Sequence, residues 1–158
     1  MGRYNPNIMG SAATVLLLSK DTYQFVPSEP KTFKRTSTDP KTKKEREIFG
    51  ISYGLRVKGG QFDGKTIPLQ FYMHTEGGFG MAKQFIMACM GYEVTQEGEA
   101  QFNADHADAD FSFDPDTNEI GEYWKKPTGA LVEADCDERA NPNNLNQKNQ
   151  TFKWRPVS

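Results

Sequence analysis

Apolar and polar positions alternate most clearly along residues 48–58. Apolar side chains occupy Phe49 and every second position after it up to Val57, which is typical of a half-buried β-strand. On the other face, Gly50 and Gly54 with a serine between them leave the middle of the strand smooth. Glycine inside a strand marks a bend or the close approach of another backbone. The pattern therefore predicts a curved sheet, or a face on which a ligand chain lies.

The same alternation predicts further strands at residues 21–26, 65–74, 129–137 and 151–157. A helical spacing of apolar residues over 81–90 predicts one helix, which Gly91 ends. The polar, charged segment 36–45 reads as a mobile basic loop joining two strands, and 141–146 reads as a polar turn or long loop.

The length of 158 residues fits one domain. We expect an N-terminal arm over residues 1–20, in which 14–18 is a candidate short strand, and a single domain over 21–158. Residues 95–122 are weakly periodic and are expected to form an insertion that is ordered in part. No apolar run approaches the ~20 residues of a membrane helix, so we expect a cytoplasmic protein without a membrane partner.

The predicted order is strand, strand, strand, helix, strand, strand. This order predicts a mainly β fold: a five-stranded OB-like Greek-key barrel with one helix after the third strand and an acidic insertion at about 95–122. An open β-sandwich with a helical plug is the alternative. Cys89 and Cys136 form no CxxC pair and are expected to be reduced thiols.

The net charge of −2 conceals two blocks of opposite sign. Residues 20–58 hold ten basic and five acidic residues, whereas residues 93–122 hold ten acidic residues and no Lys or Arg. Basic side chains contact phosphates and aromatic rings stack on unpaired bases. The basic block also carries Phe33, Phe49 and Tyr53, although the last two share the apolar strand face and are expected in the core.

Several segments resemble a known pattern: Asp-Thr-Tyr-Gln-Phe at 21–25, Phe-Asp-Gly-Lys at 62–65, Phe-Tyr at 71–72, Ala-Cys-Met-Gly at 88–91, Lys-Pro-Thr-Gly-Ala-Leu-Val at 126–132 and Asn-Gln-Thr-Phe-Lys-Trp at 149–154. With them the chain resembles small phage single-stranded DNA-binding proteins of OB type, encoded near recombination or replication genes. The resemblance covers about residues 21–156. The chain departs from that family in the acidity of 97–122 and in its basic last residues.

The resemblance implies non-enzymatic, sequence-tolerant binding of single-stranded DNA in phage replication or recombination, in the cytoplasm of the host. Single-stranded DNA and replication or recombination proteins of the phage would be the partners, and no cofactor or metal is expected. The basic and aromatic residues that we expect at the DNA are Lys34, Arg35, Lys41, Lys43, Lys44, Arg46, Arg56, Lys58, Gln70, Tyr72, Trp124, Lys125, Lys126, Lys153, Trp154 and Arg155.

Other interpretations remain open. The basic block can be a solvated loop, and each tryptophan can be an edge residue that caps the barrel. A structural or adaptor protein could use the barrel to bind a protein. A small nuclease could hold Mg²⁺ in the acidic segment, where Asp108 to Glu119 follow an EF-hand-like spacing but Phe113 replaces the required glycine. The acidic segment can also be a lid over the basic groove, a partner site or a solubility loop.

Overall fold

The computed structural model describes residues 18–141 and 144–157. The short strand expected at 14–18 lies outside them except for Leu18, as does most of the expected N-terminal arm. The elements in chain order are β1 (Asp21–Pro27), β2 (Lys31–Thr38), β3 (Glu45–Lys58), β4 (Thr66–Tyr72), α2 (Gly78–Cys89), α3 (Gln96–Asp105), β5 (Phe113–Asp114), β6 (Glu119–Ile120), α4 (Glu122–Lys125), β7 (Val132–Asn141) and β8 (Asn144–Pro156).

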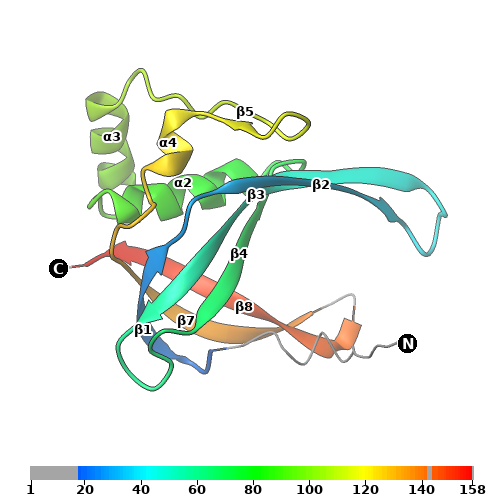
Figure 1. The fold of residues 1–158 in the computed structure, drawn as a ribbon, viewed down its shortest axis with the longest axis horizontal. Helices are drawn as coiled ribbons and strands as arrows, with labels where there is room; N and C mark the ends of the chain where they lie inside the picture. Colours follow the sequence, from blue (N-terminus) through cyan, green and yellow to red (C-terminus); the bar gives the residue numbers. More distant parts are fainter. Residues whose placement is uncertain (1–17, 142–143, 158) are drawn as a thin grey trace.

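The main sheet is antiparallel, and β3 is its longest strand. One edge of β3 pairs first with β2 and then with β1, while its other edge pairs with β4. Strand β1 continues the sheet through β7 to β8. The mainly β prediction is confirmed, but the main sheet of the described residues has six strands instead of five, and α2 follows the fourth strand rather than the third because β2 was not predicted. The sheet is open, because no pairing among the described residues joins β4 to β8, and α2 packs against both of these strands (Figure 1).

The hydrophobic core lies between the sheet and α2. The alternation in β3 places Ile51, Tyr53, Leu55 and Val57 in it, as the sequence predicted. Phe49 is half-buried at the edge of the core, where its ring lies 6.2 Å from that of Phe113. The face of β3 that carries Gly50 and Gly54 therefore points away from the core.

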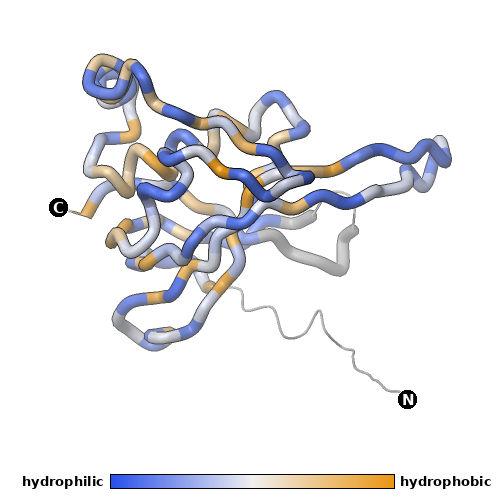
Figure 2. The backbone as a smooth tube through the Cα atoms, turned by 45° about the horizontal axis from the view of Figure 1, so that its top comes forward, coloured by the Kyte–Doolittle hydropathy of each residue, from blue (hydrophilic) through white to orange (hydrophobic). Residues whose placement is uncertain are grey.

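The basic segment is a β-hairpin rather than a loop over 36–45. Strand β2 runs to Thr38 and β3 begins at Glu45, so only residues 39–44 form the turn. Asp39 Oδ1 accepts a hydrogen bond from the Lys41 backbone N–H at 2.8 Å. The hairpin projects from the body of the molecule, and its far end is hydrophilic (Figures 1 and 2). The prediction failed because the polar residues of β2 conceal its strand pattern.

The acidic insertion is folded along its length. Helix α3 begins after Thr95, whose Oγ1 accepts a hydrogen bond from the Gly98 N–H at 3.0 Å. Phe102 on this helix is buried, and Phe111 and Phe113 pack against the core. These aromatic anchors hold the segment on the body, which corrects the expectation of partial order.

The last two strands are longer than predicted. β7 extends to Asn141 and β8 begins at Asn144, so the turn between them is shorter than the predicted 141–146. Helix α2 spans 78–89, close to the predicted 81–90. Among the described residues, no helix has the length and apolar character needed to cross a membrane.

Candidate nucleic-acid interface

Strands β2, β3 and β4 share a face that points away from α2 and the core. The pairing register aligns Phe33 of β2 with Gly50 of β3 and Gly50 with Tyr72 of β4. Because side chains alternate along a strand, this row defines the other members of the same face. We call it the outer face; its members are Lys31, Phe33, Arg35, Ser37, Arg46, Ile48, Gly50, Ser52, Gly54, Arg56, Lys58, Thr66, Pro68, Gln70 and Tyr72.

The outer face carries positive charge without negative charge. Its five cations are exposed, and none of them forms an ion pair within residues 18–141 and 144–157. The two acidic residues of β3, Glu45 and Glu47, alternate onto the opposite face. A face of this kind attracts phosphates, whose contacts supply salt-dependent affinity. The cations are Lys31, Arg35, Arg46, Arg56 and Lys58.

Two aromatic rings meet over the smooth part of the outer face. Phe33 and Tyr72 lie edge to face with centroids 5.6 Å apart. The Arg35 guanidinium lies 5.5 Å from the Phe33 centroid and 5.8 Å from that of Tyr72. A side chain at Gly50, between the two rings, would collide with the carbonyl of Phe71. Tyr72 remains 38% exposed, so its ring is available to stack on a base.

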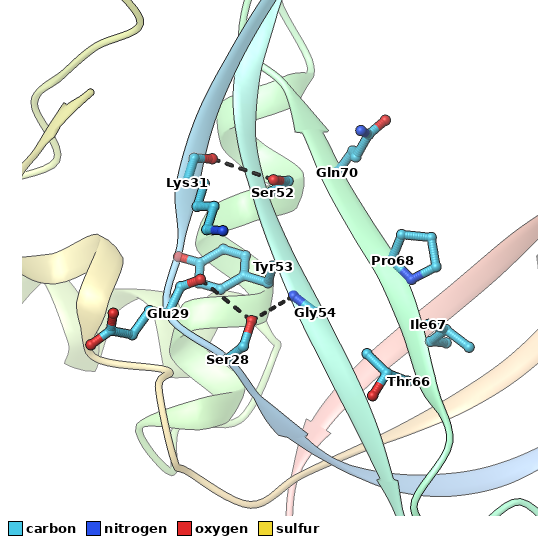
Figure 3. A pocket seen from close by; sticks show the side chains of 10 residues that line it. All are labelled: Ser28, Glu29, Lys31, Ser52, Tyr53, Gly54, Thr66, Ile67, Pro68 and Gln70. Carbon is cyan, nitrogen blue, oxygen red and sulfur yellow. Dashed lines mark hydrogen bonds between the residues drawn. The ribbon is translucent and has the colours of Figure 1, made fainter. Parts of the chain in front are cut away.

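A hollow of about 410 Å³ continues the outer face beyond the aromatic pair (Figure 3). Its floor includes Ser52 and Gly54 of β3. Ser28, between β1 and β2, borders it and holds Gly54 through two hydrogen bonds: Ser28 N–H donates to Gly54 O and Gly54 N–H donates to Ser28 Oγ, both at 2.8 Å. The other lining residues are Glu29, Lys31, Tyr53, Thr66, Ile67, Pro68 and Gln70.

Lys34, a predicted DNA contact, lies on the opposite face of β2. Its Nζ is 2.7 Å from Asp116 Oδ1 and 3.4 Å from Glu47 Oε2. The hydrogen bond to Asp116 is the main cause that raises the Lys34 pKa. Thr32, on the same side, donates hydrogen bonds from its N–H and its hydroxyl to Asn118 Oδ1. The acidic insertion therefore contacts the inner side of the hairpin and leaves the outer face open.

The predicted residues of the turn lie at the end of the projecting hairpin. Lys41, Lys43 and Lys44 are exposed there, and Lys43 adopts a positive φ of 60°. The hairpin extends the sheet and does not fold over it (Figure 1). These lysines can reach a phosphate backbone that continues past Arg46 on the same strand pair.

Both tryptophans are buried, which removes them from the predicted interface. Trp124 is fully buried, and its Nε1 donates to Phe111 O at 2.7 Å. Trp154 is 7% exposed and stacks on Phe152, with centroids 4.7 Å apart. Neither ring presents a face to a base. Basic neighbours, Lys125 and Lys126 after Trp124 and Lys153 and Arg155 around Trp154, suggested exposure in the sequence, but a short helix and strand alternation turn the rings inward.

The remaining predicted cations lie away from the outer face. Lys125 and Lys126 belong to the end of α4, where Lys126 Nζ is 3.6 Å from Glu122 Oε1. Lys153 and Arg155 lie on β8. Arg155 is committed to two carboxylates, with Nε 2.5 Å from Glu133 Oε2 and Nη1 2.8 Å from Asp135 Oδ2. The structure therefore does not join these four residues to the candidate interface.

The acidic insertion shows no metal centre among the described residues, which hold no group of three or more His, Cys, Asp or Glu side chains suited to an ion. Asp110 instead accepts hydrogen bonds from the N–H and the hydroxyl of Ser112, at 3.0 and 2.6 Å, and these bonds lower its pKa. Cys89 and Cys136 are both free, as predicted, and burial raises the pKa of each thiol.

Lys31 and Phe33 were missing from the predicted set of contacts. The signal was present in β2, where Lys31, Phe33 and Arg35 alternate with Thr32 and Lys34. It was hidden because both faces of β2 are largely polar, so no apolar face marked the segment as a strand.

No protein-family model matches the chain, and no curated protein matches it. A function must therefore be inferred from the exposure, charge and geometry of its own residues. Those properties single out the outer face.

Proposed function

We propose that the outer face binds single-stranded DNA, without catalysis and with tolerance of sequence along most of the strand. The observation that carries this proposal is the coincidence of five cations without ion pairs in the described residues and the exposed ring of Tyr72 on the outer face of β2, β3 and β4, whose own members include no carboxylate. Cations supply contacts to phosphates, and an aromatic ring stacks on any base because every base has a π-face.

The shape of the outer face favours a single strand over a duplex. Gly50, Ser52 and Gly54 form a low strip along β3, with side chains of β2 and β4 on each side. Bases that stack on Tyr72 or enter the hollow must be unpaired and unstacked from their neighbours. A rigid duplex can offer the cations its phosphates but cannot offer the ring a base face.

The strand order supports an OB-like arrangement for this proposal. β1 pairs with both β3 and β7, and α2 follows β4, which is the third strand of the chain if the projecting strand β2 is treated as an addition to the OB-like series. In OB-folds the second and third strands and the loop before the second strand bind oligonucleotides. The corresponding parts here are β3, β4 and the basic turn at 39–44. Together with the resemblance to phage proteins, this supports a role in phage replication or recombination.

Fluorescence anisotropy with labelled oligonucleotides tests the proposal. The full chain is titrated into a single strand and into a duplex of equal length at several salt concentrations. We expect tighter binding of the single strand and an affinity that falls as salt rises. Equal affinity for both forms, or no binding of either, would overturn the proposal.

A further inference from the structure

A chain of hydrogen bonds orients the amide of Gln70. The Arg35 Nη2 lies 3.5 Å from Tyr72 Oη, and Tyr72 Oη lies 2.9 Å from Gln70 Oε1. A guanidinium can only donate, so the Tyr72 oxygen accepts from Arg35 and its own proton goes to Gln70 Oε1. This arrangement occupies the carbonyl of Gln70. Its NH₂ group bonds to no other described residue and remains a donor.

Gln70 and Lys31 lie on either side of Ser52 in the hollow. Lys31 pairs with Ser52, and Ser52 pairs with Gln70, so the three residues form one row across the sheet. Two strand spacings separate the Cα atoms of Lys31 and Gln70 by about 10 Å, and both side chains line the hollow. Figure 3 shows Ser52 between them and Glu29, the acidic lining residue, at the opposite end from Gln70.

A base lying over Ser52 would therefore meet donors on both sides. The Lys31 ammonium and the Gln70 NH₂ can donate but cannot accept. Thymine and uracil carry an acceptor at O4 and guanine carries one at O6, whereas the N7 acceptor is common to guanine and adenine and does not discriminate between them. Cytosine carries an amino group at N4, as adenine does at N6, and these groups would face other donors and lose their hydrogen bonds.

Building on the proposed DNA-binding function, we propose that Gln70 and Lys31 make this hollow a position that prefers keto bases over amino bases. Tyr72 is a positioning residue for this preference, because its hydroxyl holds the Gln70 carbonyl. The rest of the strand is bound through phosphates and stacking, so selectivity is confined to the base over Ser52. A well-placed pair of hydrogen bonds discriminates by about fivefold or more.

Competition anisotropy with oligo(dU) and oligo(dC) of equal length tests the preference. The two polymers share the same backbone and differ only in the base. Uracil has a carbonyl oxygen at O4 and a proton on N3, whereas cytosine has an amino group at N4 and no proton on N3. The wild-type chain should prefer oligo(dU) by about fivefold or more. Gln70→Glu exchanges the donor for an acceptor, so the ratio of the two affinities should shift towards oligo(dC). This ratio cancels the general loss of affinity that the added negative charge causes.

Two further variants separate orientation from charge and stacking. Tyr72→Phe keeps the ring and removes the hydroxyl, so total affinity should hold while the preference for oligo(dU) falls. Gln61→Glu makes the same charge change at an exposed position between β3 and β4, outside the hollow, and should leave the ratio unchanged.

The outcomes distinguish this inference from the function on which it rests. Binding of both polymers with equal affinity overturns the preference but not the DNA-binding function. A preference for oligo(dU) that Gln70→Glu leaves unchanged also overturns the inference. The preference would then come from the weak stacking of uracil bases on one another in the free strand, and not from hydrogen bonds to Gln70. Failure of the wild-type chain to bind either polymer overturns the proposed function and the inference with it.

Discussion

The outer face and the acidic insertion carry charge of opposite sign, and their charges are used differently. In the insertion, Asp105 accepts hydrogen bonds from Tyr92 and Gln101, and Asp110 accepts two from Ser112. The cations of the outer face make no ion pairs within the described part of the chain. A block of charge therefore indicates binding only where its side chains lack partners within the fold.

The aromatic residues of the two regions differ in the same way. Phe102 and Trp124 are buried beneath the insertion, whereas Tyr72 on the outer face is 38% exposed. The insertion uses its rings for folding, and the outer face leaves a ring open to solvent. Mutations in the two regions should therefore separate loss of stability from loss of binding.

Trp124→Ala should have the largest effect, and the effect should be on stability. Removal of a fully buried indole and its hydrogen bond to Phe111 should lower the free energy of unfolding by about 3–5 kcal/mol, as measured by urea denaturation. The folded fraction should keep its DNA affinity. Wild-type stability together with weakened binding would place Trp124 in the interface after all.

Tyr72→Ala should weaken DNA binding rather than stability. Without the ring on which a base stacks, DNA binding should weaken by about 1–3 kcal/mol, with little change in the slope of affinity against salt. Anisotropy titrations at several salt concentrations measure both quantities. If affinity is unchanged, the exposed ring does not contact a base.

The salt slope itself separates the cations of the outer face from those elsewhere. Replacing Arg46, Arg56 and Lys58 with Ala should make the log–log slope shallower by about 2, at ~0.7 for each phosphate that the variant no longer neutralises. The control removes the same charge by replacing Lys125, Lys126 and Lys153, and should leave the slope close to that of the wild type. Equal changes in both variants would show a general field effect and no defined interface.

The smallest expected effect is on the pH dependence of stability, through Asp105 of the insertion. Hydrogen bonds from Tyr92 and Gln101 lower the Asp105 pKa below its ordinary value of about 3.9. A carboxyl group whose pKa is lowered in the folded state stabilises the protein at pH values above its ordinary pKa. This contribution is lost as the pH falls through the folded-state pKa. Asp105→Asn should therefore lower the Tm at neutral pH, and the difference from wild type should shrink below about pH 4. A constant difference at all pH values would contradict this linkage.

Much of the fold could be predicted from local patterns in the sequence. The alternation in β3 identified the buried face with Ile51 to Val57, and helical spacing identified most of α2. Strand β2 was missed because polar residues occupy both of its faces. Helix α3 was missed although Thr95 precedes it as an N-cap, because its apolar face is reduced to Phe102.

The candidate site could be predicted only in part. Arg35, Arg46 and Tyr72 were identified from charge and alternation, and the structure places all three on the outer face. Trp124 and Trp154 were misassigned because basic neighbours suggested exposure. Burial depends on which elements cover a residue, and this information is not contained in its immediate neighbours.

The sequence by itself determined the period of two that separates neighbouring side chains onto opposite faces of a strand. Only the tertiary structure decided which of those faces is open. Lys34 and Arg35 are adjacent and carry the same charge, yet Lys34 pairs with Asp116 of the insertion while Arg35 lies against Tyr72 on the outer face. The physical reason is that α2 and the insertion pack on one side of the sheet. A cation such as Lys34 on that side meets acidic partners, whereas the five cations of the outer face on β2 and β3 remain available to phosphates.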